Sequence, residues 1–468
     1  MAGSITGAAG QPALTPSSSK AALPSNYINN FDFLNQYLPD TYEKEFERYG
    51  NRSISAFLRM VGAEMPTNSD LIKWEEQGRL HTKFEGVTTA TADGQDNATL
   101  AITGHNLRAG QTIFISDGTA GSSASNKAIV TTATNANDVT VAYYEAAGQA
   151  VGMQASTNIV VFVYGSEFRK GSTGMVGSLE AEPVIKDNKP IIIKDKYVVS
   201  GSDMAQIGWV EVTSENGASG YLWYIKSEHE TRLRFDDYLE MSMIEGVPAE
   251  AGSGAIASLS PAPGATDAGT KGLFHEIENN GNVWSGGNPS ALADFDAIIQ
   301  RLDKQGAIQE NVMFVNREFG FDIDDMLAAQ NSYGAGGTSY GLFDNDEEMA
   351  LNLGFSGFKR GYEFYKTDWK YLNDATLRGG IIGGAVNGVL VPAGSTNVYD
   401  QVMGRNAKRP FLHVRYRASE TEDRRYKTWM TGSAGGAATS DLDAMEVNFL
   451  SERALCTLGA NNFFIFKD

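Results

Sequence analysis

The chain has 468 residues, room for roughly three domains of about 150 residues, each with its own core. Its 38 Lys and Arg against 57 Asp and Glu give a formal net charge of -19, which argues against whole-chain attraction to nucleic acid or anionic membranes. Its single cysteine, Cys456, excludes an internal disulfide. With no apolar run near the roughly 20 residues of a membrane helix and no signal-peptide pattern, we expect a soluble protein made in the cytosol.

The first segment, residues 1–85, is expected to form an N-terminal arm with short helices. Residues 1–24 are small and polar, so burial cannot offset the entropy of ordering them. Residues 67–80 place apolar side chains at helical spacing after Asn68 or Ser69, either of which is a candidate N-cap.

The composition changes at residue 86. Residues 86–164 are rich in Thr, Ala and Val, and their alternating runs are separated by Gly, Asn and Asp. This pattern is typical of short strands joined by tight turns. We therefore expect a small all-β insertion domain over 86–164.

Residues 165–218 are expected to form an extended hairpin loop. Two strand-like runs flank Asp187-Asn188-Lys189-Pro190, a sequence typical of a turn. A hairpin alone is marginal in water, so it needs a partner, either its own domain or a neighbouring molecule.

A long helix is predicted within residues 219–250, from about Gly220 to Glu245, with Ser219 as cap and Gly246 at its end. Its middle is polar, which predicts a bridge whose two ends dock separately. Most of the charges on this helix have an opposite charge one turn away, and only the step from Asp236 to Glu240 joins like charges, so we interpret them as a solvated helix surface instead of an acid/base site. The predicted ion pairs are Glu228 with Arg232, Arg232 with Asp236, and Glu230 with Arg234.

Residues 251–400 are predicted to be an α/β unit. Ser290 is the expected cap of a helix ending at Leu302, residues 311–316 form a buried strand, and residues 319–330 form a second helix. Residues 401–468 complete the chain. Alternation there predicts Leu412, Val414 and Tyr416 inward and His413, Arg415 and Arg417 outward.

A basic segment interrupts the acidic background. Its members are Arg405, Lys408, Arg409, Arg415, Arg417, Arg424, Arg425 and Lys427. Aromatic residues lie among them, which is compatible with binding nucleic acid. Docking to acidic patches of neighbouring copies, or pairing with the local acids Glu420, Glu422 and Asp423, explains the segment equally well.

Three short motif matches lack the context that their chemistry needs. Residues 337–341 match the nucleophile elbow around Ser339, but no strand precedes them. Residues 252–257 match a dinucleotide fingerprint, also without a strand, and are expected to form a loop. Asp344, Asp346 and Glu348 begin like a calcium loop but lack its glycine and its closing glutamate. The five histidines show no ligand spacing, so we expect no catalytic residue, cofactor or metal.

The order of segments resembles the HK97-fold major capsid proteins of tailed bacteriophages, with crAss-like or related phages as the nearest group. The likeness rests on residues 180–199 as the extended loop, residues 220–246 as the spine helix, residues 272–319 in the axial domain and residues 411–430 in the peripheral domain. It implies an α+β fold with an N-terminal arm, an extended loop, a spine helix, and axial and peripheral domains.

The resemblance also implies a function. Copies would form the hexamers and pentamers of an icosahedral head around double-stranded DNA, assembled in the host bacterial cytoplasm, with no enzymatic activity. Its partners would be copies of itself, portal, scaffolding and head-decoration proteins, and packaged DNA bound non-specifically, with no membrane. Two alternatives remain: a virion-surface or secreted adhesin using residues 86–164, and a hydrolase using Ser339.

Overall fold

The structure is a computed structural model, and it confirms the predicted α+β class, with more strands than helices among the described residues. The described residues are 57–58, 63–92, 97–133, 136–146, 157–180, 182–205, 212–213, 219–220, 223–250, 252–259, 268–306, 308–331, 356–400, 405–436 and 438–468. Two compact units divide the chain. The smaller contains residues 196–233 and 430–447, and the larger contains most of the rest.

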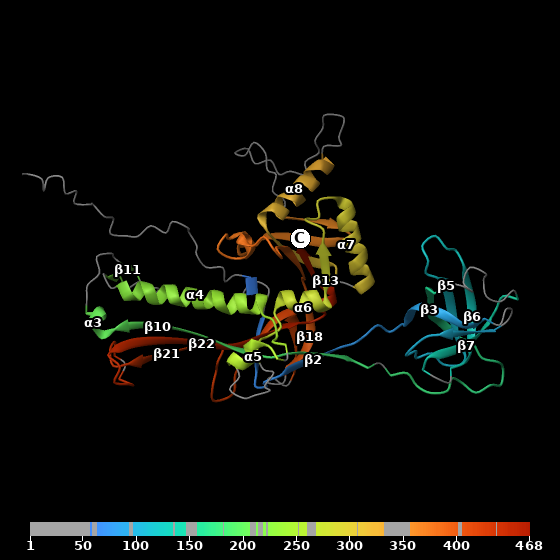
Figure 1. The fold of residues 1–468 in the computed structure, drawn as a ribbon, viewed down its shortest axis with the longest axis horizontal. Helices are drawn as coiled ribbons and strands as arrows, with labels where there is room; N and C mark the ends of the chain where they lie inside the picture. The colour runs from blue at the N-terminus through green and yellow to red at the C-terminus, as the bar shows by residue number, and fades with distance from the viewer. Residues whose placement is uncertain are drawn as a thin grey trace, which may run out of the picture. The chain divides into compact units, whose positions relative to one another are not determined.

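A six-stranded sheet forms the first part of the larger unit (Figure 1). Its order is β13-β23-β17-β14-β16-β15, and it includes both parallel and antiparallel neighbours. The strands are β13 (Asn282–Ser285), β14 (Glu310–Val315), β15 (Gly357–Arg360), β16 (Tyr362–Asp368), β17 (Val386–Pro392) and β23 (Phe464–Lys467). Every residue of β17 is buried, as a central strand covered on both faces requires.

Helices cover both faces of this sheet. On one face, α7 (Leu292–Gln305) and α8 (Arg317–Asn331) contribute Phe295 and Phe319 to a core with Phe464. On the other, α6 (Leu273–Asn280) contributes Leu273 to a second core. The predicted strand and both predicted helices are therefore confirmed.

The predicted cap of α7 is wrong by one residue. The N-cap is Ala291, and the carboxylate of Asp294 accepts the backbone N–H groups of Ser290 at 3.2 Å and Ala291 at 3.1 Å. A carboxylate in the first turn does the capping that the sequence suggested for the Ser290 hydroxyl.

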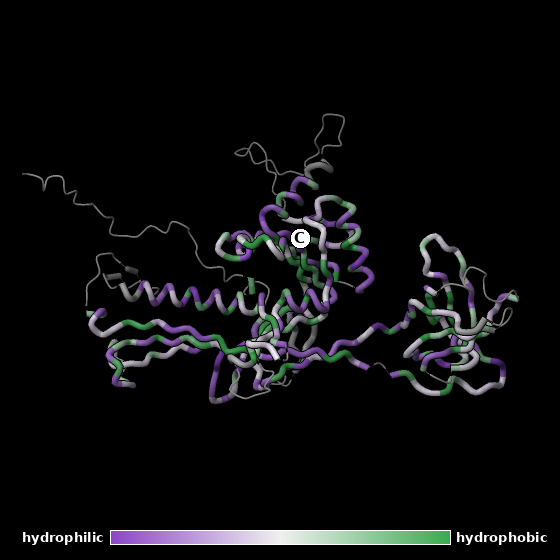
Figure 2. Tube along the Cα trace, in the orientation of Figure 1, coloured by the Kyte–Doolittle hydropathy of each residue, from purple (hydrophilic) through white to green (hydrophobic). Residues whose placement is uncertain are grey.

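A second sheet has the order β1-β20-β22-β10, and β21 also pairs with β22. Its strands are β1 (Ala63–Thr67), β10 (Ile191–Ser200), β20 (Leu412–Arg417), β21 (Lys427–Gly432) and β22 (Ala444–Thr457). The strand β10 stands at an edge, and two hydrophobic stretches flank its hydrophilic centre (Figure 2). It thus offers backbone hydrogen-bonding groups and apolar side chains on one strand.

The long helix is α4 (Trp223–Glu245), which confirms the prediction of a helix ending before Gly246. Ser219 is not its cap, because Ser219–Gly220 form strand β12, paired with β11 (Val212–Thr213). The division between the two compact units falls within this helix, between residues 233 and 234, so its interpretation as a bridge stays a prediction. Thr231, Phe235, Leu239 and Met243 are buried at four-residue intervals, so one continuous face of the helix packs.

Residues 83–166 form a closed six-stranded barrel in the order β3-β4-β7-β6-β5-β8, which confirms the strands predicted over 86–164. The strands are β3 (Lys83–Ala92), β4 (Asn97–Ala101), β5 (Gln111–Asp117), β6 (Ser125–Thr132), β7 (Asp138–Tyr143) and β8 (Ile159–Ser166). Alternate residues such as Ile113, Val139 and Val161 fill its interior. Closure leaves the barrel without an open sheet edge.

The predicted hairpin is wrong. Strand β9 (Val184–Asn188) pairs with β2 (Ile72–Glu76), while β10 pairs with β22. The stretch read as a turn instead leads the chain from one sheet into another, and Pro190 offers no N–H for a ladder. The helix predicted over 67–80 is also wrong, because residues 72–76 form strand β2. Along this strand the side chains of Ile72 and Trp74 lie on one face, and those of Lys73 and Glu75 lie on the other. We call the β2 and β9 pair the ribbon.

The smaller unit contains α3 (Gly201–Met204), in which the hydroxyl of Ser200 accepts the N–H of Asp203 at 3.1 Å. Lys196 Nζ lies 3.3 Å from a carboxylate oxygen of Glu446. The remaining described elements are α5 (Gly254–Leu259), α9 (Lys370–Asn373), β18 (Ser395–Asp400), β19 (Arg405–Pro410), and the short helices Arg378–Gly380 and Ala460–Asn462.

Candidate functional site

The ribbon is fixed at one end. Ile72 faces Asn188 in the last pair of its ladder, and both are buried. Ile72 packs against Ala454 and Cys456 of β22, with Trp74 beside them. Apolar burial thus attaches β2, whereas β9 depends on polar contacts.

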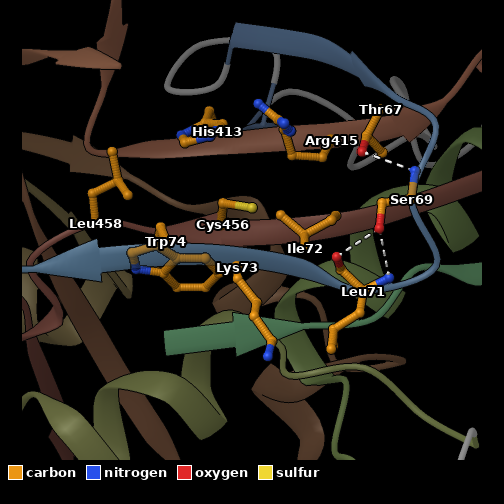
Figure 3. Close-up of a pocket in the computed structure, with 10 residues that line it drawn as sticks. All are labelled: Thr67, Ser69, Leu71, Ile72, Lys73, Trp74, His413, Arg415, Cys456 and Leu458. Atoms are coloured by element: carbon orange, nitrogen blue, oxygen red, sulfur yellow. Dashed lines mark hydrogen bonds between the residues drawn. The ribbon is translucent and has the colours of Figure 1, made fainter. Parts of the chain in front are cut away.

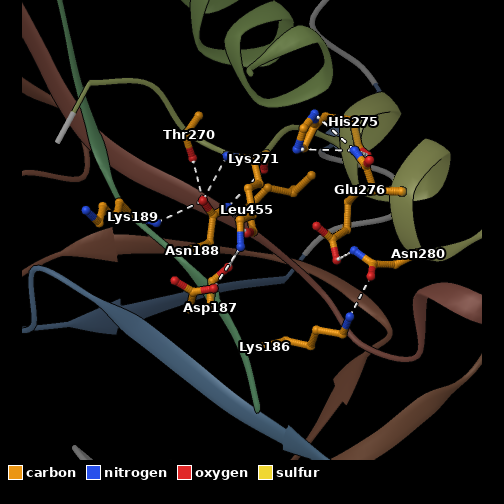
Figure 4. A network of polar contacts seen from close by, with 11 residues as sticks. Lys186, Asp187, Asn188, Lys189, Thr270, Lys271, His275, Glu276, Asn280 and Leu455 are labelled. Carbon is orange, nitrogen blue, oxygen red and sulfur yellow. Dashed lines mark hydrogen bonds and ion pairs between the residues drawn. The ribbon is translucent and has the colours of Figure 1, made fainter. Parts of the chain in front are cut away.

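The side chain of Asn188 uses all of its usual hydrogen-bonding capacity (Figure 4). Its amide nitrogen donates to the carbonyl of Leu455 at 2.6 Å and to that of Lys271 at 2.9 Å. Its oxygen accepts the N–H groups of Lys189 and Lys271 and the hydroxyl of Thr270. Asn188 is 3% exposed and so joins three distant segments through one amide. Sequence reasoning missed this role of Asn188, because Asn before Lys-Pro is equally typical of a turn.

Charged groups surround this anchor. Lys271 Nζ donates to the Asp187 carboxylate at 2.7 Å and lowers the pKa of that carboxyl. Lys186 Nζ donates to Asn280 Oδ1 at 2.5 Å, and the Asn280 amide donates to Glu276 Oε1 at 2.7 Å. Burial raises the pKa of Glu276, against the attraction of Lys271 and Lys186.

The Glu276→Gln variant is expected to be more stable than the parent at neutral pH. A raised pKa means that the fold favours the protonated acid, so the charged form costs stability above the folded pKa, and this cost disappears below the ordinary value of 4.5. Glutamine keeps the acceptor for Asn280 without the charge. Thermal unfolding from pH 4 to pH 8 should show the variant gaining as pH rises, and equal stability at all pH values would contradict the burial argument.

A cavity of about 270 Å³ lies between β2, β20 and β22 (Figure 3). His413 and Cys456, which face each other across β20 and β22, contribute to its wall with Arg415 and Trp74. His413 is 2% exposed, so its predicted outward orientation is wrong, while Leu412 and Val414 are buried as predicted. The strand is covered on both faces here because the ribbon packs over the side expected to face solvent.

Cys456 is expected to resist alkylation in the folded chain. Burial raises the pKa of its thiol to about 12, and the thiolate is the reactive form. Iodoacetamide labelling followed by mass spectrometry should modify Cys456 in urea but not in native buffer at pH 8. Rapid native labelling would show that the ribbon does not stay packed over it.

The other end of β9 exposes apolar side chains. Val184 is 51% exposed and Ile185 is 57% exposed. Ile192, at the start of edge strand β10, is 54% exposed. Two consecutive strands thus present apolar residues beside sheet edges that no other described strand pairs, a combination that single soluble chains normally avoid.

No protein-family model and no curated protein matches the chain. The chain is similar to solved phage structures. A structure from Microbacterium phage Oxtober96 aligns at 11% identity and a TM-score of 0.39, over 94% of this chain and 99% of that one. One from Gordonia phage Cozz aligns at 9% identity and a TM-score of 0.38, over 97% and 96%. The capsid of a native GTA particle aligns at 9% identity and a TM-score of 0.37, over 92% and 95%.

Four members of the basic segment have carboxylate partners within the chain. Arg417 lies 2.5 Å from Asp70, Arg424 lies 2.7 Å from Glu452, Lys427 lies 2.5 Å from Glu422, and Arg425 contacts Glu64. Arg415 donates to the sulfur of Met65 at 3.6 Å. Arg405, Lys408 and Arg409 lie on β19, with side chains outside the described residues. Of these four pairs, that of Lys427 is with one of the local acids named above, Glu422, while the other three are with carboxylates elsewhere in the chain.

On α4, Lys226 Nζ lies 3.9 Å from a carboxylate oxygen of Glu230, an i,i+4 pair that the sequence analysis did not include. The pairing of Glu228 with Arg232, of Arg232 with Asp236 and of Glu230 with Arg234 stays a prediction. Surface pairs of this kind contribute about 0.3–0.5 kcal/mol each.

The motif matches add no site within the described part of the chain. Residues 254–257 begin the short helix α5, so the predicted loop at 252–257 is wrong there. The matches at 337–341 and at Asp344, Asp346 and Glu348 lie outside the described residues. Among the residues described, no group of three or more His, Cys, Asp and Glu side chains is arranged to hold a metal, and no helix is long and apolar enough to cross a membrane.

Proposed function

We propose that this chain is the major capsid protein of a phage, a structural subunit that assembles with copies of itself. The observation that carries the proposal is the exposure of Val184, Ile185 and Ile192 on the ribbon and on edge strand β10. A second copy that covers these residues would remove apolar surface from water and supply partners for the strand edges.

The anchor at Asn188 supports this interpretation. A two-stranded ribbon is marginal by itself in water, yet here five hydrogen bonds to one buried amide fix its base. Because its base is fixed, the ribbon already has the conformation in which its exposed apolar end would contact a second copy. This preorganisation lowers the entropic cost of association.

The charge distribution fits a container for DNA. A net charge of -19 disfavours tight binding of DNA phosphates to the chain. Four basic residues already contact carboxylates within the chain: Arg417, Arg424, Arg425 and Lys427. In this proposal hexamers and pentamers form an icosahedral head in the host bacterial cytoplasm. Double-stranded DNA would be held non-specifically inside it, with portal, scaffolding and decoration proteins as further partners.

Within this proposal, several segments take the roles that the resemblance implies. The ribbon would be the extended loop, in place of the hairpin predicted within 165–218, and α4 would be the spine helix. The six-stranded sheet would belong to the axial domain and the β1-β20-β22-β10 sheet to the peripheral domain. The barrel is then an insertion between the two strands of the extended loop, since its residues lie between β2 and β9 in the chain.

Size-exclusion chromatography with light scattering, followed by negative-stain microscopy, tests the proposal on the purified full chain. We expect rings, sheets or closed particles whose proportion rises with protein concentration. A monomer at every concentration, with or without a crowding agent, would contradict it.

A further inference from the structure

We propose that the outer face of the barrel is a glycan-binding site centred on Tyr164, a function separate from shell formation. Strand pairing brings its side chains together. Lys127 on β6 lies opposite Phe114 on β5, and Phe114 lies opposite Phe162 on β8. The N–H of Tyr144, just after β7, donates to the carbonyl of Lys127 at 3.1 Å. Four adjacent strands therefore contribute to one surface.

Tyr164 occupies a β-bulge on this surface. Val163 pairs with Ile113 and Gly165 pairs with Thr112, so no residue of β5 stands opposite Tyr164. A bulge redirects the side chain of its extra residue and is frequent beside functional sites. The Tyr164 side chain is 48% exposed, and Lys127 Nζ lies 5.8 Å from the centre of its ring.

Hollows lie on both sides of Tyr164. One of about 490 Å³ is lined by Tyr144, Tyr164 and Glu167, among others. The other, of about 670 Å³, is lined by Leu80, Phe162 and Tyr164, among others. Two shallow hollows that share one aromatic wall match a chain of linked sugar units better than a single small molecule, which binds in an enclosed pocket.

Polar groups in the first hollow are already positioned. The hydroxyl of Tyr144 donates to Glu167 Oε2 at 2.6 Å, which fixes both side chains. Thr112 is 4% exposed, and its Oγ1 has no hydrogen-bond partner among the described residues. It also lines this hollow, and a side chain at Gly165 would lie 3.1 Å from that oxygen. A buried hydroxyl without a partner is costly. Its oxygen is closed to solvent in the free chain, so a ligand hydroxyl would bond to it only after neighbouring side chains move aside.

The chemistry favours a saccharide over a protein partner. A pyranose presents C–H groups on its faces and hydroxyls around its rim, and tyrosine presents an apolar ring with a polar tip. Protein interfaces bury about 800 Å² per partner around an apolar centre. Here Lys127, Glu167 and Thr112 interrupt the rings, which suits alternating C–H and hydroxyl groups.

Affinity electrophoresis of the full-length chain through gels containing dextran, mannan or glycol chitin tests the site. We expect at least one glycan to retard the chain, and Tyr164→Ala to weaken that binding about tenfold, as loss of one stacking contact does elsewhere. Thr112→Val should weaken binding several-fold without lowering the unfolding temperature, because it removes a hydroxyl that has no partner in the fold.

Tyr365→Ala is the matched control. Tyr365 is 49% exposed and its hydroxyl also donates to a carboxylate, that of Glu363 at 3.4 Å, but it lies on β16 of the six-stranded sheet. It should bind glycan as the parent does. No retardation by any of the three glycans, or retardation unchanged by both Tyr164→Ala and Thr112→Val, would overturn the site. Neither result bears on assembly, which is measured separately.

Discussion

The Asn188→Asp variant is expected to lose about 3 kcal/mol or more of its free energy of unfolding. The parent amide donates to the carbonyls of Leu455 and Lys271, and a carboxylate cannot donate to either. Two carbonyls then face a negative charge at a site only 3% exposed. Urea unfolding followed by circular dichroism at pH 7 measures the loss.

Asn279→Asp makes the same chemical change at an exposed position on α6, where the lost bond from the amide to the His275 carbonyl is replaced by water, and should cost less than about 1 kcal/mol. If both variants unfold at the parent's urea concentration, Asn188 does not anchor the ribbon. If only Asn188→Asp loses stability, a second result is expected for that variant. Because the ribbon packs over Cys456, that thiol should become reactive to iodoacetamide at urea concentrations below global unfolding.

The Ile185→Lys variant is expected to fold normally but to lose assembly. Ile185 is 57% exposed in the single chain, so a lysine there costs the monomer little. In an assembled shell the same position would be covered, and a buried lysine without a partner is strongly unfavourable. Light scattering of the purified variant should show monomers at concentrations where the parent forms larger species.

Thr132→Lys serves as the control, since it adds the same charge at an exposed polar residue of barrel strand β6. It should assemble as the parent does, with an unchanged unfolding temperature. Assembly of Ile185→Lys at the parent's concentration would show that β9 takes no part in contacts between copies.

Much of the fold follows from local sequence pattern. Leucine and isoleucine at helical spacing predict α7 and α8, and alternation between glycine-rich turns predicts the barrel strands. These elements are predictable because the residues that define each of them are near neighbours in the chain.

The failed predictions concern contacts between distant segments. The pairing of β2 with β9 spans more than 100 residues and encloses the barrel, so no local signal near Asn188 or Ile72 reveals it. The burial of His413 likewise depends on the ribbon packing across β20 and β22. Asn188 lies in a sequence that is typical of a turn, but it is buried and makes the contacts of a core residue.

The glycan site on the barrel was missed for a related reason. Alternation places Phe162 and Tyr164 on the outer face of β8, but the bulge opposite Thr112 appears only when β5 and β8 are aligned. Two aromatic residues in a strand-rich segment are otherwise an ordinary feature of a sheet surface.

Amide hydrogen exchange of the ribbon, measured in the free chain and in assembled particles, tests the central claim most directly. If copies complete one another, the amides of residues 184–188 and 191–193 exchange at least ten times more slowly in particles than in the free chain, a change of about 1.4 kcal/mol in opening free energy. Equal protection in both states would contradict the claim that these strands serve self-assembly.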